Sequence, residues 1–305
     1  MMTWYYLQPV SCSEGRGCLM AIFYFKLKII SRGKGCSVIS AAAYRACEKL
    51  CNPYDGRIAD YTRKGSNVFK NILLPTHAPI EFYDREKLWG SLEEIEKNKR
   101  AQLCREITVA LPKELELQEQ IKLVQDYCLK NFVDKGMACD INIHDKGDGN
   151  PHAHILLPMR AFDTTSNSIW ASKQKKIYML DESGKKIYDK EKKQYACRTE
   201  ATNNWGNKEN LINWRKSWAQ EVNRSLERNN INESIDYRSY HERGIKDVIP
   251  QFHEGKKNYM VEETFSLKIN QKIRECNIVG ATIIKDIALI YKEYNKEEEE
   301  RNRRR

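Results

Sequence analysis

Long hydrophobic runs are absent from the sequence. No apolar segment approaches the ~20 residues that a helix needs to cross a bilayer, so we expect no membrane insertion. The first nineteen residues also lack the basic start and the long apolar core of a secretory signal, and we interpret residues 1–19 as a disordered or untranslated leader. Together these absences predict a cytoplasmic protein.

Paired cysteines with the spacing of a metal site are absent as well. The ten cysteines form no Cys-x-x-Cys pair, and residues such as Cys104 and Cys128 lie among apolar or helical neighbours. Isolated thiols of this kind are typical of the reducing cytoplasm and not of disulfide frameworks or zinc sites.

Acidic residues are outnumbered by basic ones. The 305 residues include 52 Lys and Arg against 42 Asp and Glu, which gives a formal charge of +10. Basic clusters gain affinity for polyanions by displacing counterions from phosphate. The balance therefore favours a nucleic-acid partner, although a basic protein without such a partner has the same composition. The length suits one large domain or two.

Histidine is scarce, yet His144, His152 and His154 lie close together in the sequence NIHDKGDGNPHAHILLP. An extended strand points residues two apart to the same side, so His152 and His154 share a face. Residues 138–144 indicate a second strand, and the Gly- and Asp-rich segment 145–151 predicts a turn. A hairpin closing there brings three imidazoles together, which is a natural site for a divalent metal. The alternative is an isolated pair of surface histidines.

Periodicity predicts alternating strands and helices in the first half of the chain. The expected order is a strand at 21–30, a helix at 37–51 with Ser37 as its N-cap, a strand at 68–75, a helix at 85–102, a strand at 105–111, a helix at 117–131 and the two strands of the histidine hairpin. This order predicts an α/β sandwich with one sheet, whose last two strands are antiparallel.

The second half of the chain is more polar. Residues 163–206 interleave lysines with Tyr178, Tyr188 and Tyr195, a pattern that suits either stacking on unpaired bases or a charged surface hairpin over the two Lys-Lys-Ile-Tyr repeats. The other expected elements are a helix at 209–229 and a helical charged tail at 261–305 with helices at 266–276 and 281–294.

Tyr44 lies in the middle of the alanine-rich helix, where small neighbours leave the phenol room. Taken alone, such a tyrosine is more often a packing aromatic than a nucleophile. Four basic residues surround it in the sequence and would favour a nearby phosphate: Arg32, Lys34, Arg45 and Lys49.

Several segments together resemble one family. AIFYFKLKIISRGKG, SAAAYRACEKL, ADYTRKG, REITVALP, FVDKGM and NIHDKGDGNPHAHILLPMR are similar to the MobA/MobL family of plasmid mobilisation relaxases, as is the later segment IDYRSYHERGIKDVIPQFHEG. The likeness covers about residues 20–255 and implies a relaxase domain at 20–260. The implied fold is a mostly antiparallel five-stranded sheet flanked by helices, the relaxase palm, followed by a mainly helical C-terminal part.

The resemblance also implies an activity and the residues that perform it. Family members nick one strand at an origin of transfer and later rejoin it. Tyr44 matches the family's nucleophile, which forms a 5′-phosphotyrosine, and His144, His152 and His154 match its metal ligands, with Mg²⁺ or Mn²⁺ as the expected ion. A phenol with a pKa of ~10 is a weak nucleophile at neutral pH, so a bound cation would assist it.

Glu106 is a further candidate in the strand at 105–111. On the face it shares with Thr108, it could be a fourth ligand, orient a histidine, or accept the tyrosine proton. An ordinary strand-end carboxylate is the competing interpretation.

The implied partner is origin-of-transfer DNA that is single-stranded at the nick site, with accessory relaxosome proteins and a coupling protein as further candidates. Three other functions fit parts of the sequence: a DNA-binding module that does not nick, a His₃ metallohydrolase with zinc-bound water, and a rolling-circle replication initiator. A tyrosine that precedes the histidine cluster favours a relaxase over an initiator. The alternative nucleophiles are Tyr24, Tyr54 and Tyr61.

Overall fold

The computed structural model describes residues 23–163, 168–191, 193–239, 241–244 and 273. The chain divides into two compact units, one of residues 25–231 and one of residues 1–24 with 232–305. The predicted leader at 1–19 lies outside the described residues, and so does the helical tail at 261–305 except for Ile273. The central sheet and its helices belong to residues 25–231.

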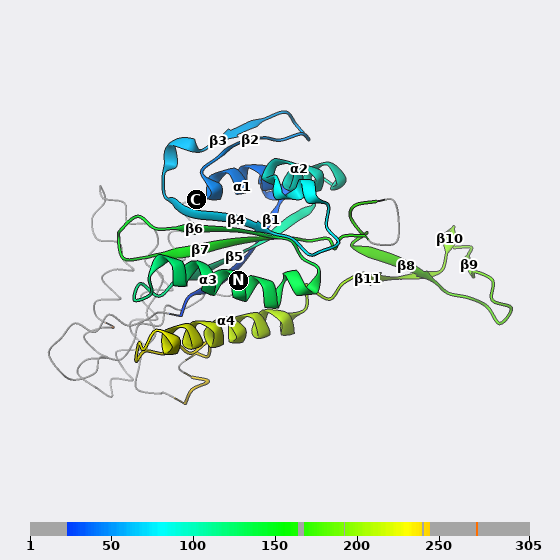
Figure 1. Ribbon diagram of the computed structural model, residues 1–305. Coiled ribbons are helices and arrows are strands. Elements are labelled where there is room, and N and C mark those ends of the chain that lie inside the picture. Colours follow the sequence, from blue (N-terminus) through cyan, green and yellow to red (C-terminus); the bar gives the residue numbers. More distant parts are fainter. Residues whose placement is uncertain (1–22, 164–167, 192, 240, 245–272, 274–305) are drawn as a thin grey trace. The chain divides into compact units, whose positions relative to one another are not determined.

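Five antiparallel strands form the central sheet. They are β1 (Phe25–Ser31), β4 (Asn67–Leu73), β5 (Gln102–Ala110), β6 (Cys139–His144) and β7 (His152–Pro158), in the order β1-β5-β7-β6-β4. Every neighbouring pair is antiparallel. The expected five-stranded antiparallel sheet flanked by helices is therefore confirmed (Figure 1).

The two faces of the sheet differ in chemistry. Strand alternation places Ile107, Ile141 and Ile155 opposite one another on one face, where all three are fully buried. The other face carries Thr108 and His154 in the same strands, because successive side chains point to opposite sides. One face is thus a conventional apolar core, while the other holds a buried polar row.

Four helices cover these faces. The bounds are α1 (Val38–Ala46), α2 (Arg85–Ile95), α3 (Leu117–Asn131) and α4 (Lys208–Arg228), with short 3-10 helices at Arg32–Lys34, Thr62–Lys64, Ile80–Tyr83 and Val133–Lys135. α1 and α2 lie on one side of the sheet, and α3 and α4 on the other (Figure 1). The hydroxyl of Tyr127 in α3 donates to the Trp214 carbonyl of α4 at 3.1 Å, which fixes these two helices together.

Two predicted helices are too long. The helix expected at 37–51 does begin after Ser37, whose side chain accepts from the Ser40 N–H, but it ends at Ala46 because Cys47 is left-handed at φ 54°. Residues beyond that point form β2 (Lys49–Cys51), which pairs with β3 (Ile58–Asp60). The helix expected at 85–102 ends at Ile95, because Gln102 already pairs with Ser31 in the sheet.

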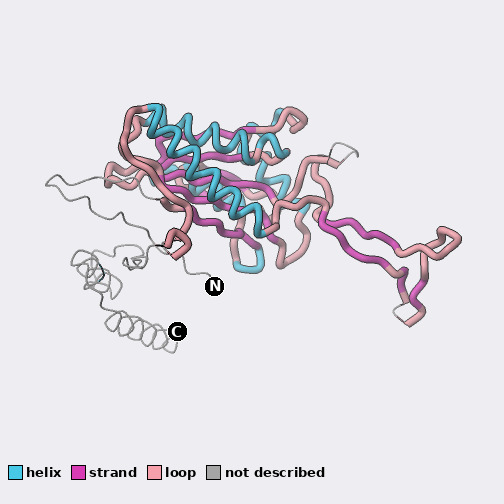
Figure 2. The backbone as a smooth tube through the Cα atoms, turned by 90° about the horizontal axis from the view of Figure 1, so that it is seen from below, coloured by secondary structure: helices cyan, strands magenta, loops and turns pink. Residues whose placement is uncertain are grey.

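A two-stranded arm follows the histidine hairpin. β8 (Gln174–Tyr178) pairs with β11 (Cys197–Ala201), and β9 (Tyr188–Asp189) pairs with β10 (Gln194–Tyr195). The strands extend away from the central sheet (Figure 2). The predicted hairpin around the turn at 181–184 is present, because Leu180 bridges Lys186 and the Ile187 N–H donates to the Met179 carbonyl. The first Lys-Lys-Ile-Tyr repeat itself pairs with β11. Stacking on bases stays a prediction for its exposed tyrosines.

Two absences in the described residues bear on the expectations from composition. None of the helices there combines the length and the hydrophobicity that a bilayer crossing requires. The cysteines of this part of the chain are all free thiols.

A buried ion pair joins α2 to the polar face of the sheet. The Arg85 guanidinium donates to both carboxylate oxygens of Asp140 at 2.8 and 2.9 Å, and the Trp89 indole N–H donates to Asp140 at 2.8 Å. The side chains of Arg85 and Asp140 are 8% and 0% exposed. The Arg85 guanidinium also pairs with Glu48 at 2.8 Å, so it is the removal of Arg85 that would leave the Asp140 charge buried without its counterion.

We therefore expect Arg85→Met to lower the free energy of unfolding by about 3–5 kcal/mol, measured by urea denaturation. Asp126→Ala is the matched control, because it removes the exposed Lys122–Asp126 ion pair in α3, and exposed pairs of this kind contribute about 0.5 kcal/mol or less. Equal effects of the two substitutions would contradict the structural importance of the buried pair.

Candidate functional site

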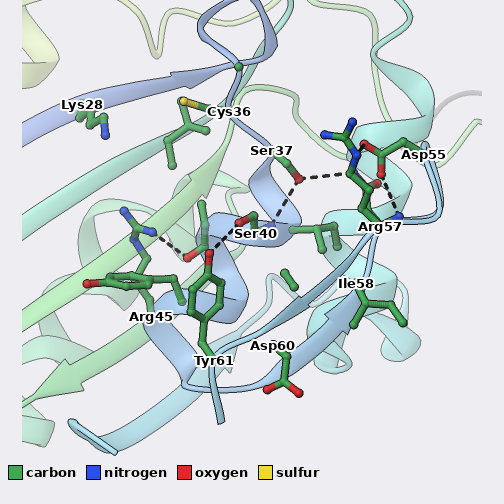
Figure 3. A pocket seen from close by; sticks show the side chains of 17 residues that line it. Lys28, Cys36, Ser37, Ser40, Arg45, Asp55, Arg57, Ile58, Asp60 and Tyr61 are labelled. Carbon is green, nitrogen blue, oxygen red and sulfur yellow. Dashed lines mark hydrogen bonds and ion pairs between the residues drawn. The ribbon is translucent and has the colours of Figure 1, made fainter. Parts of the chain in front are cut away.

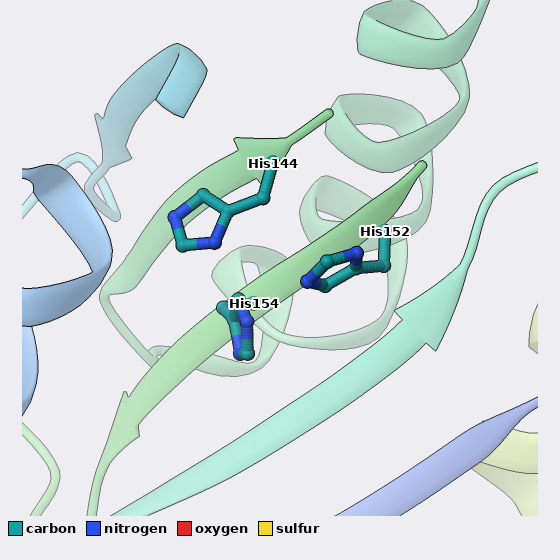
Figure 4. Close-up of side chains that lie close together, drawn as sticks. All are labelled: His144, His152 and His154. Atoms are coloured by element: carbon teal, nitrogen blue, oxygen red, sulfur yellow. The ribbon is translucent and has the colours of Figure 1, made fainter. Parts of the chain in front are cut away.

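Three histidines meet at the turn end of the β6–β7 hairpin. His144 ends β6 and faces His152 at the start of β7, and His154 follows two residues later on the same face. Their ring centroids lie 4.9 to 5.6 Å apart. One nitrogen from each ring lies within 4.8 Å of the others, and the rings point toward a common centre (Figure 4). The hairpin therefore brings together the residues that its sequence predicted.

Each imidazole has one nitrogen bound to a protein oxygen. His154 Nδ1 lies 2.9 Å from Glu106 Oε1, His152 Nδ1 lies 2.9 Å from the Asn150 carbonyl, and His144 Nε2 lies 2.6 Å from the Arg45 carbonyl. A carbonyl or carboxylate oxygen only accepts, so the nitrogen that faces it carries the proton. The other nitrogen of each ring then keeps its lone pair, which is the arrangement found around metal-bound histidines.

The protonation of the site also suits a metal. Burial lowers the pKa of His144 to about 4 and lowers the pKa of His154 as well. Both imidazoles are then neutral near pH 7, and only a neutral imidazole coordinates a cation. The donor set and its partners thus fit a divalent ion.

Glu106 lies beside the histidines but is not part of the cluster. Burial alone would raise the pKa of this carboxyl, but hydrogen bonds from His154 and Arg45 lower it to about 2. Both oxygens accept from Arg45 at 2.6 Å, and one of them also contacts His154. With its oxygens engaged in this way, the carboxylate is arranged to orient His154, which is one of the three roles left open by the sequence.

Arg45 connects the helix α1 to this centre through both its side chain and its backbone. The guanidinium binds Glu106, while the carbonyl contacts His144 and accepts from Asn67 Nδ2 at 2.8 Å. Asn67 also contacts Asn142 in β6 at 3.3 Å. The residue that directly follows Tyr44 is therefore fastened to the hairpin at several points.

Tyr44 lies on the exposed side of this connection. Its side chain is 37% exposed and packs edge-on against the Tyr61 ring, with 5.2 Å between the ring centroids. Both tyrosines line a cavity of about 590 Å³ between α1 and the β2–β3 hairpin, together with Lys28 and Arg57 (Figure 3). The cavity leaves space beside the Tyr44 ring, and the next residue, Arg45, contacts Glu106 and His144.

The four basic residues predicted to bind DNA differ in whether their charged groups already have a protein partner. Lys34 and Lys49 are exposed. The Arg32 guanidinium instead forms an ion pair with Glu93 at 2.6 Å and lies over the Tyr54 ring, and that of Arg45 is taken by Glu106. DNA binding stays a prediction for all four, and the geometry gives Arg32 and Arg45 structural partners.

Sequence reasoning missed three residues of the site. Thr108 Oγ1 lies 3.3 Å from His154 Nδ1, and Asn67 links α1 to β6 as described above. Lys64 lies over the Tyr44 ring. Alternation along β5 could have found Thr108, but only the tertiary fold brings Lys64 to Tyr44.

The alternative nucleophiles differ in their surroundings, and of these Tyr61 lies beside Tyr44. Tyr54 lies under Arg32, and the Tyr61 hydroxyl is 3.3 Å from Ser40 Oγ. Tyr24 lies outside the unit of residues 25–231.

Known proteins resemble this chain in sequence and in fold. The sequence model of the MobA/MobL family matches residues 36–264. The conjugal transfer protein TraA of Agrobacterium fabrum is 35% identical over 247 residues, which are 77% of this chain and 21% of TraA. The probable mobilization protein MobA of Bifidobacterium longum is 30% identical over 290 residues, 89% of this chain and 50% of MobA. The chain thus spans between about a fifth and a half of these relatives.

A solved structure described as the molecular basis of vancomycin resistance transfer in Staphylococcus aureus also matches. It has a TM-score of 0.57 and 28% sequence identity, and the match covers 72% of this chain and 100% of that one. The likeness extends from sequence to fold.

The contacts of Glu106 predict an effect on metal affinity. Glu106→Gln removes the negative charge that orients His154, so we expect the affinity for Mn²⁺ to fall by about 10–100-fold, measured by calorimetric titration. Glu93→Gln is the matched control, because Glu93 is an equally buried carboxylate that pairs with Arg32 away from the histidines. Its Mn²⁺ affinity should stay unchanged, and an equal loss in both variants would contradict the orienting role.

Proposed function

Because the chain belongs to the MobA/MobL family, we propose that it is a relaxase, which nicks one DNA strand at an origin of transfer and rejoins it during plasmid mobilisation. The names of its relatives, which include conjugal transfer and mobilization proteins, support this role. One observation carries the proposal: the exposed Tyr44 is followed directly by Arg45, whose side chain and carbonyl bind the surroundings of the three histidines.

The proposed reaction uses Tyr44 as the nucleophile. Its phenolic oxygen attacks the scissile phosphorus, so that a new O–P bond forms while the bond from phosphorus to the 3′ oxygen breaks. The phenol gives up its proton, and the leaving oxygen takes one to become a free 3′-hydroxyl. The 5′-phosphotyrosine conserves the energy of the broken linkage, so attack by a 3′-hydroxyl on the same phosphorus restores the strand without ATP.

His144, His152 and His154 would hold the divalent ion. When bound, such an ion draws charge from the non-bridging phosphate oxygens and helps to orient the scissile phosphate. Of the two ions expected from the sequence, Mn²⁺ fits three nitrogen donors better than Mg²⁺, which prefers oxygen ligands. Glu106 then acts by orienting His154 and by holding Arg45.

The substrate follows from the same proposal. A tyrosine attacks a phosphodiester in line with the leaving oxygen, which requires a strand that can bend into the cavity beside Tyr44. We infer origin-of-transfer DNA that is single-stranded at the nick, acted on in the cytoplasm, with accessory relaxosome proteins and a coupling protein as the partners that deliver it.

A covalent-adduct assay tests the proposal. Purified protein is incubated with Mn²⁺ and single-stranded oligonucleotides that tile the transfer origin, and protein–DNA adducts are resolved in SDS. We expect an adduct that Tyr44→Phe abolishes, because the variant lacks the attacking oxygen, and that Tyr61→Phe retains.

The products distinguish the other functions. Cleavage that leaves free 5′-phosphates and proceeds equally in Tyr44→Phe would indicate a metallohydrolase. Binding without cleavage would indicate a DNA-binding module, and an adduct that persists in Tyr44→Phe would assign the nucleophile to another tyrosine. An adduct formed at a replication origin in place of a transfer origin would indicate a replication initiator.

A further inference from the structure

A buried arginine in the central sheet has no counterion in the described part of the chain. Arg105 in β5 is 5% exposed, and it lies on the face of the sheet opposite to Glu106 and Thr108, because successive side chains of a strand alternate. Among the described residues its guanidinium reaches the Pro158 carbonyl alone, at 3.5 Å, which is the outer limit of a hydrogen bond. Burial lowers the pKa of Arg105, and no carboxylate of these residues opposes that shift.

The neighbouring basic residues already have partners. Arg160 and Lys173 both bind Glu96 Oε1, at 2.7 and 2.6 Å, and Lys173 also donates to the Gln102 carbonyl at 2.6 Å. Burial is the main cause that lowers the pKa of Lys173, and the positive charges of Arg160 and Arg105 add to it. Arg105 therefore gains no counterion from Glu96, whose single charge is shared by two other cations.

The amino end of α4 lies next to the same guanidinium. A Cβ placed on Gly206, two residues before the helix, would lie 3.8 Å from Arg105 Nη2. Asn207 is the N-cap, but its side chain makes no capping hydrogen bond. The N–H groups of Lys208 and Glu209 have no acceptor among the residues that the structure describes. These donors lie where α4 begins, beside the base of the arm (Figure 1).

Two positive groups thus lie side by side. The aligned peptide dipoles of a helix place about half a positive charge at its amino end, and α4 has 21 residues. A buried cation beside such an end is unfavourable unless an anion lies with them. Glu209 in the first turn is exposed, and within the described part of the chain it forms no ion pair with Arg105. The arrangement therefore favours an anion from outside the described residues.

We propose that Arg105 and the first N–H groups of α4 form a phosphate-binding site, on the face of the sheet opposite to the histidines. The planar guanidinium binds two oxygens of a phosphate at once, and free N–H groups at a helix start bind such anions. The ligand is a phosphate group, carried either by the backbone of a DNA strand or by a free phosphate compound. This site goes beyond the proposed relaxase function, because phosphate binding there requires neither Tyr44 nor a metal.

The test measures how far inorganic phosphate raises the melting temperature of the full chain, relative to chloride at the same pH and ionic strength. A ligand that binds only the folded protein stabilises it. Arg105→Met removes the charge and keeps a side chain of similar length. Arg198→Met is the matched control, because Arg198 is an exposed arginine of β11 that pairs with Glu200.

A second variant keeps Arg105 and fills the site. Gly206 is exposed, and Gly206→Asp would place a carboxylate beside Arg105 Nη2, in the space proposed for the phosphate. Gly206→Ala is its control, because the added methyl group would make an ordinary contact at 3.8 Å. This pair decides the question if Arg105→Met does not fold.

We expect phosphate at about ten times its dissociation constant to raise the melting temperature of the wild-type chain by about 3–6 °C. Arg198→Met and Gly206→Ala should show the same rise, and Arg105→Met and Gly206→Asp little or none. The inference is overturned if phosphate stabilises the wild-type chain no more than chloride does. It is equally overturned if Arg105→Met and Gly206→Asp keep the full rise, since the phosphate would then bind elsewhere.

The salt dependence of DNA binding identifies the source of the phosphate. Affinity for a single-stranded oligonucleotide is measured in the Tyr44→Phe background. If a DNA phosphate occupies the site, Arg105→Met should reduce the slope of log affinity against log salt by about 0.7. An unchanged slope, together with a lost melting shift, assigns the site to a free phosphate compound. A chain that forms no covalent adduct but keeps the Arg105-dependent shift would refute the relaxase function and leave this site standing.

Discussion

The ion pair between Arg45 and Glu106 joins the two parts of the site that the chain encodes far apart. Arg45 lies in the last turn of the helix that carries Tyr44, and Glu106 lies in the central sheet next to His154. Both side chains are largely buried, so the attraction between them is offset by the cost of removing two charges from water. The pair therefore adds little net stability, but it fixes where the helix ends relative to the histidines.

Further buried polar contacts continue along the same face of the sheet. Asn142 lies opposite His154 in β6 and donates to Asp140, which in turn binds Arg85 and Trp89 of α2. Buried polar groups persist only where their hydrogen bonds are satisfied. The row of partners allows polar side chains to lie buried beside the apolar cluster that packs α1 and α2 on this face of the sheet.

Local patterns in the sequence predicted the parts of this structure that depend on local interactions. The helix at 117–131 and the histidine hairpin follow from apolar spacing and turn residues, and both are present with the expected bounds. The prediction of a helix at 37–51 was wrong at its C-terminal end. Glu48 and Lys49 favour helices, but Lys49 instead pairs with Asp60 across the β2–β3 hairpin. Tertiary pairing outweighed propensity there.

The site shows the same division between local and distant interactions. Spacing alone placed the three histidines together, because they belong to one hairpin. The contact of Arg45 with Glu106 spans 61 positions of the chain, and that of Lys64 with Tyr44 spans 20. No periodicity in the sequence encodes such contacts. The sequence therefore predicted a DNA-binding role for Arg45 and did not indicate that its partner is a buried carboxylate.

These distant contacts together set the net charge of the site in the proposed reaction. A carboxylate beside a phosphate would repel it, yet Glu106 is needed to orient His154. Arg45 cancels that charge at 2.6 Å, and burial keeps His144 and His154 neutral. The protein thus orients its histidines with a carboxylate whose negative charge is cancelled inside the site.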